Sequence, residues 1–574
     1  MRRQVVASLI SAVTLLAVLL GGAPAATPAA ASPWVERTLA SLTLREKAAQ
    51  MVMPWIPGGS ELEDEALRRA QRLVQRYAVG GFIVGKGEMH LTAHALRQLQ
   101  QESKVPLLVS ADLESGAAMR LLGATAFPSH MALGATAEPE LAYGQGRATA
   151  LEARVLGVHV AFAPVADVNV NPLNPIINTR AFGERPDRVA DMVEAFVRGV
   201  QDGGMLAVAK HFPGHGDTRT DSHRALPVIQ ADRARLDSVE LVPFRRAIAA
   251  GVGGIMTAHI ALPRVTRGNE PATLSRPIVT GILRQELAFD GLVFTDALNM
   301  AGVSGYSQGE VVVRAIAAGA DIVLQPPNTD LAVNAIVNAV RRGRISSARV
   351  DASVRRILAA KERVDAGQQA ADAVARDSVR ALGERHRELA ATIAARAITL
   401  VRHDSAMLPL EGADTIVSIV YTGRTGRASG EALERALRRA GRVVEHVRIA
   451  SRAAPADLEK ARAAAMRDGR VVLMSSYTQV VPGRATLGLP AAVARWVAEL
   501  SAARPVIYAS FGDPYVIAGF PDVAAYLLAW SDAAVSQEAA ARALLGLSPI
   551  AGTLPISIPP AFEVGDGVRR EPAN

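Results

Sequence analysis

The chain has 574 residues, which is enough for two to four domains. Apolar residues make up 49% and charged residues 21%, as in an ordinary globular protein with a large core. The formal net charge is +8, but basic and acidic residues are interleaved, no run of five like charges occurs and only 4% of residues are aromatic, so we exclude a nucleic-acid partner.

The N-terminal segment 1–31 has the three parts of a secretory signal peptide. Arg2 and Arg3 precede an apolar run over 5–20, and small residues rich in alanine follow up to Ala31. The run is short for a helix that spans a membrane, and an uncleaved anchor is the alternative. The chain has no Cys, hence neither a lipid-modified cysteine nor a disulfide. We expect a periplasmic or secreted protein without stable membrane insertion after cleavage.

Residues 32–365 alternate between short, largely apolar runs and amphipathic helical patterns. Such runs are typical of parallel strands with both faces buried. Helical patterns separate them, for example over 61–77, 138–156, 186–203 and 232–250. Eight alternating units predict an α/β fold with an N-terminal (β/α)8 barrel of the TIM type. The eight expected strands are 51–53, 81–84, 106–110, 158–164, 206–209, 254–257, 292–295 and 321–324.

A second α/β pattern follows the barrel. Residues 366–395 are rich in Ala, Arg, Glu and Gln and predict a helical linker. Residues 396–574 predict a smaller α/β sandwich domain with helices near 456–468, 490–503 and 535–546. No glycine-rich phosphate loop follows its first strand, so we expect no dinucleotide there. Its expected strands are 415–421, 443–447, 471–475, 505–510 and 525–530.

Polar residues follow the C-terminal ends of most barrel strands. In a (β/α)8 barrel these ends converge on one face, where catalytic residues lie. We therefore expect one site at this face. The residues are Asp112 and Glu114 after the third strand, Asp167 and Asn169 after the fourth, Lys210 and His211 after the fifth, His259 after the sixth, Asp296 after the seventh and Gln325 after the eighth.

The densest polar segment is 210–223, which holds three His, two Asp and one Lys in 14 residues. One interpretation is acid/base chemistry by His223, with Asp221 fixing its tautomer, because histidine exchanges protons near neutral pH. The other is a metal site, although the spacing matches no recognised zinc pattern. Its ligands would be His211, His215, Asp217 and His223.

The segment Lys-His-Phe-Pro-Gly-His-Gly-Asp-Thr over 210–218, followed by Asp-Ser-His over 221–223, resembles the signature of bacterial β-N-acetylglucosaminidases of glycoside hydrolase family 3. Segments 162–169, 178–183, 256–259, 271–275 and 291–300 agree in order, so the resemblance covers about 35–365. Residues 400–410 resemble the entry to the family's second, sandwich domain. The resemblance implies retaining hydrolysis of terminal non-reducing β-linked N-acetylglucosamine, with neither a metal nor a cofactor.

The resemblance also implies roles for single residues. Asp296 is expected to be the nucleophile that forms a covalent glycosyl-enzyme, and the Asp221–His223 dyad to be the acid/base. One departure is that the family has Glu-Gly-Gly-Arg where this chain has Glu114-Ser115-Gly116-Ala117. The expected sugar-binding residues are Asp112, Arg120, Arg180, Lys210 and His211.

Several alternatives remain open from the sequence. The natural substrate is expected to be a peptidoglycan fragment or a chitooligosaccharide that ends in N-acetylglucosamine. A β-N-acetylglucosaminide phosphorylase and a family 3 β-glucosidase are the nearest alternatives. A metal-dependent barrel hydrolase and a non-catalytic sugar-binding protein are more remote.

Overall fold

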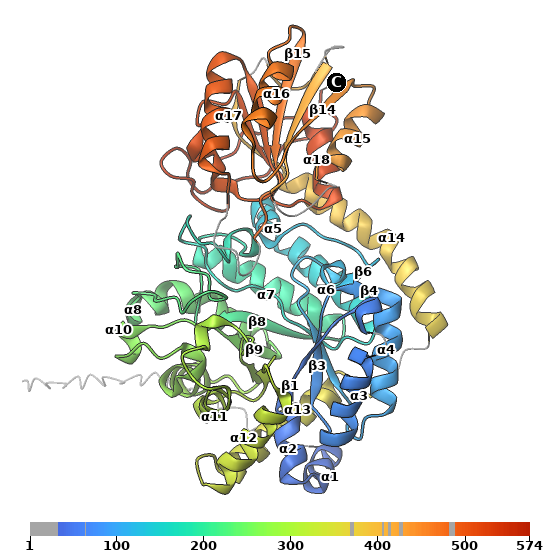
Figure 1. Ribbon diagram of the computed structural model, residues 1–574, viewed down its shortest axis with the longest axis vertical. Helices are drawn as coiled ribbons and strands as arrows, with labels where there is room; N and C mark the ends of the chain where they lie inside the picture. Colours follow the sequence, from blue (N-terminus) through green and yellow to red (C-terminus); the bar gives the residue numbers. More distant parts are fainter. Residues whose placement is uncertain are drawn as a thin grey trace, which may run out of the picture.

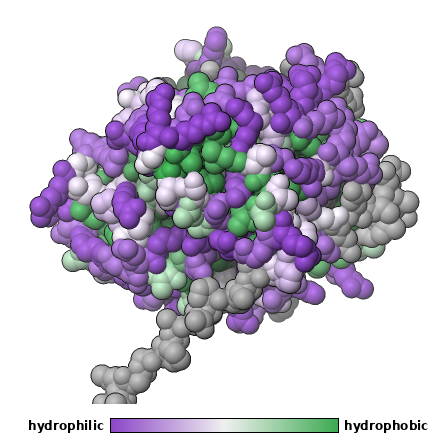
Figure 2. Space-filling model, turned by 90° about the horizontal axis from the view of Figure 1, so that it is seen from below, coloured by the Kyte–Doolittle hydropathy of each residue, from purple (hydrophilic) through white to green (hydrophobic). Residues whose placement is uncertain are grey.

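The computed structural model describes residues 32–573 except 63–64, 368–371, 405–406, 411–414, 424–428 and 481–487, and it leaves out the side chains of 372–380. The expected signal peptide, 1–31, lies outside the described residues. Within them, no helix combines the length and the apolar character needed to cross a bilayer. Figure 2 shows one face of the molecule, on which hydrophilic residues predominate and apolar residues form smaller patches.

All eight expected barrel strands are present, and they are parallel. The first, expected over 51–53, is β1 (Val52–Met53), which pairs with β11; after Pro54 the chain continues as an unexpected short strand, β2 (Trp55–Ile56), which pairs with β3. A bridge between Phe294 and Ile322 joins the seventh and eighth strands, so the sheet closes on itself. The fold class predicted from the sequence is confirmed. The other strands are β3 (Gly81–Val84), β5 (Leu108–Ala111), β7 (Val160–Ala161), β8 (Leu206–Phe212), β9 (Gly254–Thr257), β10 (Leu292–Phe294) and β11 (Val323–Leu324).

Helices cover the outside of the barrel (Figure 1). Helix α7 illustrates the rule, because it buries Val189, Val193, Phe196 and Val200 along one stripe and begins with Pro186, whose missing N–H costs nothing at that position. The helices that follow the eight strands are α3 (Glu65–Tyr77), α4 (Met89–Gln101), α6 (Pro139–Val155), α7 (Pro186–Asp202), α9 (Leu241–Ala249), the π-helical η6 (Pro277–Glu286), α11 (Gln308–Ala318) and α12 (Thr329–Arg341).

Further elements complete the barrel region. Helices α1 and α2 precede the first strand, and α13 packs against both of them. Strands β4 and β6 form a small separate ladder. These elements are α1 (Pro33–Ser41), α2 (Leu44–Gln50), β4 (Gly87–Glu88), β6 (Leu121–Leu122), α5 (His130–Thr136), α8 (Arg233–Arg235), α10 (Pro263–Thr266) and α13 (Ser347–Arg363).

The second sheet has six strands in the order β12-β17-β16-β15-β13-β14. The five expected strands are parallel, and a sixth strand that the sequence did not predict, β12, lies antiparallel at the edge beside β17. Separate apolar clusters lie on its two faces, as in a sandwich. The strands are β12 (Thr399–His403), β13 (Thr415–Tyr421), β14 (Val444–Ile449), β15 (Arg470–Ser476), β16 (Val506–Ser510) and β17 (Ala525–Leu528). The helices are α15 (Glu431–Arg439) and α18 (Ala534–Leu544) on one face, and α16 (Pro455–Ala465) and α17 (Ala491–Ala503) on the other.

Helix α14 (Asp372–Ala397) runs from the barrel to the second sheet and packs along α5, α6 and α18 (Figure 1). The domains also touch beyond the fourth barrel strand. There the amide of Asn169 donates to the hydroxyl of Tyr515 at 3.0 Å, and the amide of Asn178 donates to Asp513 at 3.2 Å. The second domain therefore stands over one side of the barrel mouth.

Candidate active site

A cavity of about 400 Å³ opens at the C-terminal ends of the barrel strands. Seven of the eight residues that the sequence analysis selected line it, and the eighth, Asp221, lies behind His223. Lys210 and His211 do not follow the fifth strand, as the sequence suggested, but belong to β8 itself. The seven lining residues are Asp112, Arg120, Arg180, Lys210, His211, His223 and Asp296.

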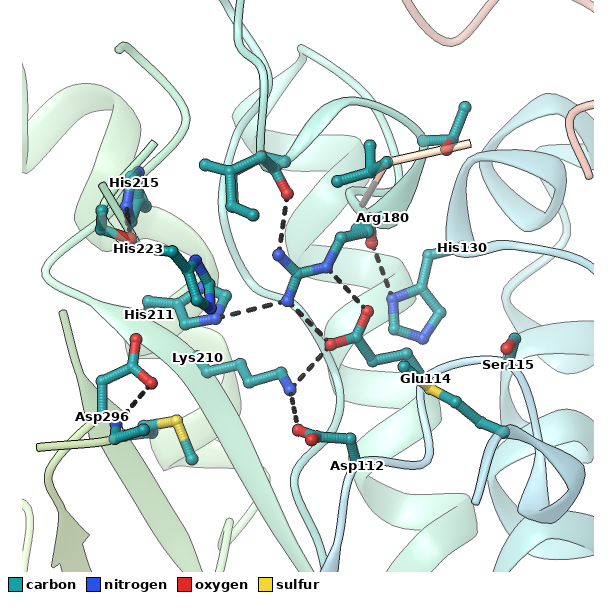
Figure 3. A pocket seen from close by; sticks show the side chains of 18 of the residues that line it. Asp112, Glu114, Ser115, His130, Arg180, Lys210, His211, His215, His223 and Asp296 are labelled. Carbon is teal, nitrogen blue, oxygen red and sulfur yellow. Dashed lines mark hydrogen bonds and ion pairs between the residues drawn. The ribbon is translucent and has the colours of Figure 1, made fainter. Parts of the chain in front are cut away.

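One wall of the cavity is a network of opposite charges (Figure 3). The Lys210 ammonium, 2% exposed, lies 2.8 Å from Asp112 and 2.7 Å from Glu114. Burial opposes its charge, but the two carboxylates outweigh burial and raise the pKa of Lys210. Burial also opposes the charged forms of Asp112 and Glu114. The cations beside them outweigh burial and hold the pKa of each carboxyl well below its usual value.

Two arginines extend this network. Arg180 donates from Nε and Nη2 to the two oxygens of Glu114 at 2.9 and 2.8 Å, and from Nη1 to the Ile176 carbonyl at 2.8 Å. Arg120 donates to Asp112 at 2.8 Å. Charge-assisted donors and acceptors fixed in this way are suited to binding the hydroxyls of a sugar. Glu114, which was expected at the strand ends but not among the sugar-binding residues, is the carboxylate that joins Arg180 to Lys210.

Glycines let the His-rich loop fold tightly over the strand ends. Gly214 has a φ of +130°, a conformation that side chains disfavour. A Cβ on Gly216 would lie 1.7 Å from the carbonyl oxygen of Val168. The loop is thereby held against the chain that follows β7, which carries Asp167.

Buried Asp167 organises the inner end of the loop. It accepts the backbone N–H of His215 at 2.7 Å and of His211 at 3.2 Å, and the ring Nδ1 of His211 at 2.7 Å. Burial raises the pKa of Asp167, but His211 and the N–H donors outweigh burial and lower it, so the carboxylate is ionised. An ionised acceptor holds a ring proton of His211 on Nδ1, and Nε2 lies 3.5 Å from the Arg180 guanidinium.

The outer end of the loop carries the pair Asp221 and His223. Asp221 Oδ1 accepts both the backbone N–H and the ring Nδ1 of His223, each at 2.9 Å. The Asp221 side chain is fully buried, whereas that of His223 is 34% exposed and borders the cavity. The contact orients the imidazole and leaves its Nε2 for the substrate side, which is the arrangement that proton transfer requires.

Asp296 follows β10, and the strand holds it in place. Its backbone N–H donates to Thr257 at 3.1 Å, and its Oδ1 accepts the N–H of Ala297 at 2.7 Å. Burial raises the pKa of Asp296, but His211, His259 and the Ala297 amide together lower it below the ordinary value. The cavity therefore presents an ionised carboxylate, which is the state that a nucleophile needs.

His259 supports the floor beside Asp296. Its Nδ1 pairs with the Thr273 hydroxyl at 2.9 Å, and its Nε2 with the carbonyl of Ala297 at 3.1 Å. Burial lowers the pKa of His259. Both ring nitrogens are thus used within the protein, and the residue positions the turn that carries Asp296.

The four residues considered as metal ligands have separate partners. His211 pairs with Asp167, His223 with Asp221, and His215 Nε2 lies 3.0 Å from the Ser222 hydroxyl. Asp217 accepts from Asn171 at 3.3 Å. Within the described ranges, no three His, Cys, Asp or Glu side chains gather closely enough to share an ion.

The second domain supplies part of the cavity wall, which no motif in the sequence indicated. Gln479 follows β15, and Asp532 follows β17. Asp532 is exposed at the cavity wall, and partial desolvation by the surrounding protein raises its pKa although Lys86 favours the charged form. The residues from this domain that line the cavity are Gln479, Val480, Ser531 and Asp532.

The sequence matches the protein-family model described as "Glycosyl hydrolase family 3 N terminal domain" over residues 43–360. A protein of Cellulomonas fimi named "Beta-N-acetylglucosaminidase/beta-glucosidase" is 32% identical over 552 residues, which cover 91% of this chain and 95% of that one. "Beta-hexosaminidase A" of Pseudoalteromonas piscicida is 34% identical over 387 residues, which cover 61% of this chain and 64%, less than two thirds, of that relative.

Solved structures extend the similarity over both domains. A glycoside hydrolase family 3 β-N-acetylglucosaminidase from Paenibacillus sp. str. FPU-7 superposes with a TM-score of 0.81 at 35% identity, covering 90% of this chain and 99% of that one. A structure titled "Beta-glucoside phosphorylase BglX bound to 2FGlc" superposes with a TM-score of 0.82 at 25% identity, covering 91% and 96%. The resemblance inferred from the His-rich loop is thereby confirmed.

Proposed function

The chain belongs to glycosyl hydrolase family 3 and is a glycoside hydrolase, and on this premise we propose that it removes terminal non-reducing β-linked N-acetylglucosamine from peptidoglycan fragments or chitooligosaccharides. The relatives named as β-hexosaminidases and β-N-acetylglucosaminidases support this substrate. The observation that carries the proposal is one cavity lined both by ionised Asp296 and by His223, whose ring Asp221 orients.

In the first step, a carboxylate oxygen of Asp296 attacks the anomeric carbon. The bond from that carbon to the glycosidic oxygen breaks, and His223 gives its Nε2 proton to the departing oxygen. The product is a glycosyl ester on Asp296 and a free aglycone. Asp221 stabilises the charged imidazole through Nδ1 before the transfer.

In the second step, water attacks the same carbon from the side that the aglycone left. His223 Nε2 takes a proton from the water, the new C–O bond forms, and the ester bond to Asp296 breaks. Two inversions give overall retention. Throughout, the charged network built on Lys210 and Arg180 is placed to hold the sugar hydroxyls.

Trapping tests the assignment of the nucleophile. A fluorinated N-acetylglucosamine derivative with an activated aryl leaving group should label the peptide that contains Asp296, and Asp296→Ala should neither be labelled nor turn over substrate. Labelling of another side chain would reject the mechanism.

Release of free N-acetylglucosamine from an N-acetylglucosamine–N-acetylmuramic acid disaccharide or from chitobiose tests the substrate.

A second candidate is phosphorolysis, which the similarity to a β-glucoside phosphorylase favours. A neutral imidazole repels an anionic acceptor less than a carboxylate does, so phosphate could replace water in the second step. Added inorganic phosphate should then yield N-acetylglucosamine 1-phosphate. If only free N-acetylglucosamine forms at any phosphate concentration, this candidate is excluded.

A third activity follows from the double name of the Cellulomonas fimi relative, which includes β-glucosidase. Comparison of kcat/KM on aryl β-glucoside and aryl β-N-acetylglucosaminide decides between the two sugars.

For its location, we propose export to the periplasm or the medium, on the strength of the signal-like segment 1–31. Cell fractionation, with N-terminal sequencing of the mature protein, tests that proposal.

A further inference from the structure

A second hollow of about 690 Å³ lies beside the catalytic cavity. Gln325, which follows the eighth barrel strand, lines both, and Asn299, three residues after Asp296, lines the second one. We call this hollow the Trp55 groove. It is lined on one side by α3 and on the other by the chain from Gln325 to the start of α12, and its residues include Pro54, Trp55, Arg69, Arg72, Arg76, Tyr77, Asn299, Gln325 and Asp330.

The Trp55 groove opens on the side of the barrel mouth away from the second domain. The second domain contacts the chain beyond the fourth strand, at Asn169 and Asn178. The groove lies at the first and eighth strands, and in a closed ring of eight strands the eighth is opposite the fourth. Gln325 therefore borders both hollows, and a substituent that leaves the catalytic cavity over Gln325 enters the groove.

Trp55 gives the groove an exposed aromatic surface. Its side chain is 50% exposed, and it is the only aromatic among the exposed large apolar residues that the structure describes. The indole lies against Gly85, where a Cβ would come within 2.8 Å of the ring. Trp combines a large apolar ring with a polar N–H, and the apolar face of a sugar ring packs well on an indole.

The polar lining of the groove is strongly cationic. Arg69, Arg72 and Arg76 are exposed, and Asp330 is the only carboxylate among the lining residues. Arg76 lies over the Tyr77 ring, 5.0 Å from its centre, so the other two exposed cations that line the groove are Arg69 and Arg72. A guanidinium binds carboxylates with two parallel hydrogen bonds, so the groove favours anionic groups over neutral ones.

We propose that the Trp55 groove is a distal aglycone subsite for substrates that carry carboxylates beyond the scissile bond. Trp55 supports the apolar face of the bound chain, and Arg69 and Arg72 bind its carboxylate. The proposal rests on the function proposed above and selects, from its two substrate classes, the acidic one. The carboxylate can belong to the lactyl ether of an acidic amino sugar or to an attached peptide.

The test compares kcat/KM of the wild type, Arg69→Gln/Arg72→Gln and Trp55→Ala on four substrates: the aryl N-acetylglucosaminide, chitotriose, the N-acetylglucosamine–N-acetylmuramic acid disaccharide, and that disaccharide with its peptide. We expect the double variant to lose about tenfold on an acidic substrate and nothing on the neutral ones, and Trp55→Ala to lose several-fold on the same acidic substrate. Arg68→Gln is the matched control, because Arg68 is exposed on α3 outside the groove.

The pattern of losses identifies the source of the carboxylate. A loss already present with the disaccharide assigns the lactyl group, and a loss that needs the peptide assigns the peptide. Equal activity of the double variant and the wild type on both acidic substrates would overturn the proposal, as would equal losses on chitotriose. If the wild type cleaves none of the four, the proposed function has failed instead, and binding of the acidic substrates to Asp296→Ala, with and without the arginine changes, still tests the groove.

Discussion

The carboxylate of Asp513, in the second domain, accepts a hydrogen bond of 3.2 Å from the side-chain amide of Asn178, in the barrel domain. Asn178 begins the short turn that ends at Arg180, and its φ of +42° lies in the left-handed region that Asn tolerates better than most residues. A contact between the domains thus fixes the turn that brings Arg180 to Glu114. The second domain supports a wall of the site as well as lining it.

Asp513→Asn should stabilise the protein at alkaline pH more than at acidic pH. Burial raises the pKa of Asp513 to about 6 in the folded state, from an ordinary value of 3.8. The folded state therefore holds this proton more tightly than the unfolded state, and stability falls as the pH rises from 3.8 through 6. Asn retains an oxygen acceptor without the charge, so it removes the burial cost that the ionised carboxyl incurs above pH 6.

Urea unfolding at pH 5 and pH 8 measures this effect. The stability advantage of Asp513→Asn over the wild type should be larger at pH 8 by about 1–2 kcal/mol. An advantage that is the same at both pH values would show that Asp513 does not titrate in this range.

Asp513→Ala, which loses the acceptor for Asn178, should raise KM more than it changes kcat, because Arg180 is then less well held.

Asp296 should remain reactive well into the acidic range. The imidazoles and the amide around it hold its pKa below the ordinary value of 3.8, against the opposing effect of burial. An aryl leaving group that needs no proton isolates this residue from the acid. The rate of labelling by a fluorinated dinitrophenyl glycoside should therefore be flat between pH 7 and about pH 4.5, and a fall in rate centred between these two pH values would contradict the ionised state of Asp296.

His223→Ala should discriminate between leaving groups. We expect a loss of about 10²–10³ in kcat/KM on alkyl glycosides and chitobiose, whose oxygens need a proton, and a loss below about tenfold on the dinitrophenyl glycoside. Asp221→Asn should show the same pattern more weakly, because it disturbs the tautomer that the 2.9 Å contact fixes. A plot of log kcat/KM against leaving-group pKa measures both, and equal losses across the series would remove His223 from the role of acid.

The sequence predicts the barrel because each strand is marked locally. Residues such as Phe82, Val109 and Val208 are fully or almost fully buried within short apolar runs, and the helices between them have a clear polar face. The edge strand β12 was not predicted, because its three buried residues are followed by exposed Arg402 and half-buried His403, a pattern that resembles the start of a loop. The spacing of apolar residues reflects burial, so a short edge strand that ends in polar residues gives only a weak strand pattern in the sequence.

The sequence likewise predicts one part of the site and not another. Asp221 and His223 are two residues apart, so a local motif reveals the pair. The link from Arg180 through Glu114 to Lys210 joins three separate strand ends, and Asp513 lies 335 positions from Asn178. Contacts across such distances depend on the closed ring of strands and on the docking of the second domain, and no spacing in the sequence records them.

Lys210→Met should show how far the fold depends on the charged network of the site. Lys210 is 2% exposed and bonds to both Asp112 and Glu114, so its removal leaves the buried Glu114 and the partly buried Asp112 with only Arg180 and Arg120 as partners. Loss of one partner from a buried ion pair costs about 3–5 kcal/mol. Lys460→Met is the control, because that lysine is exposed on α16.

The pH dependence separates this charge effect from a simple packing defect. In the folded wild type the pKa values of Asp112 and Glu114 lie below their ordinary values of 3.8 and 4.5. Their contribution to stability is therefore complete above those ordinary values and is lost as the pH falls through the folded ones. In Lys210→Met the folded values rise, so the gap in unfolding free energy from the wild type should be widest at pH 7 and should narrow at pH 3.5. A gap of constant size would mean that the methionine merely packs badly, and that the ammonium contributes nothing as a charge.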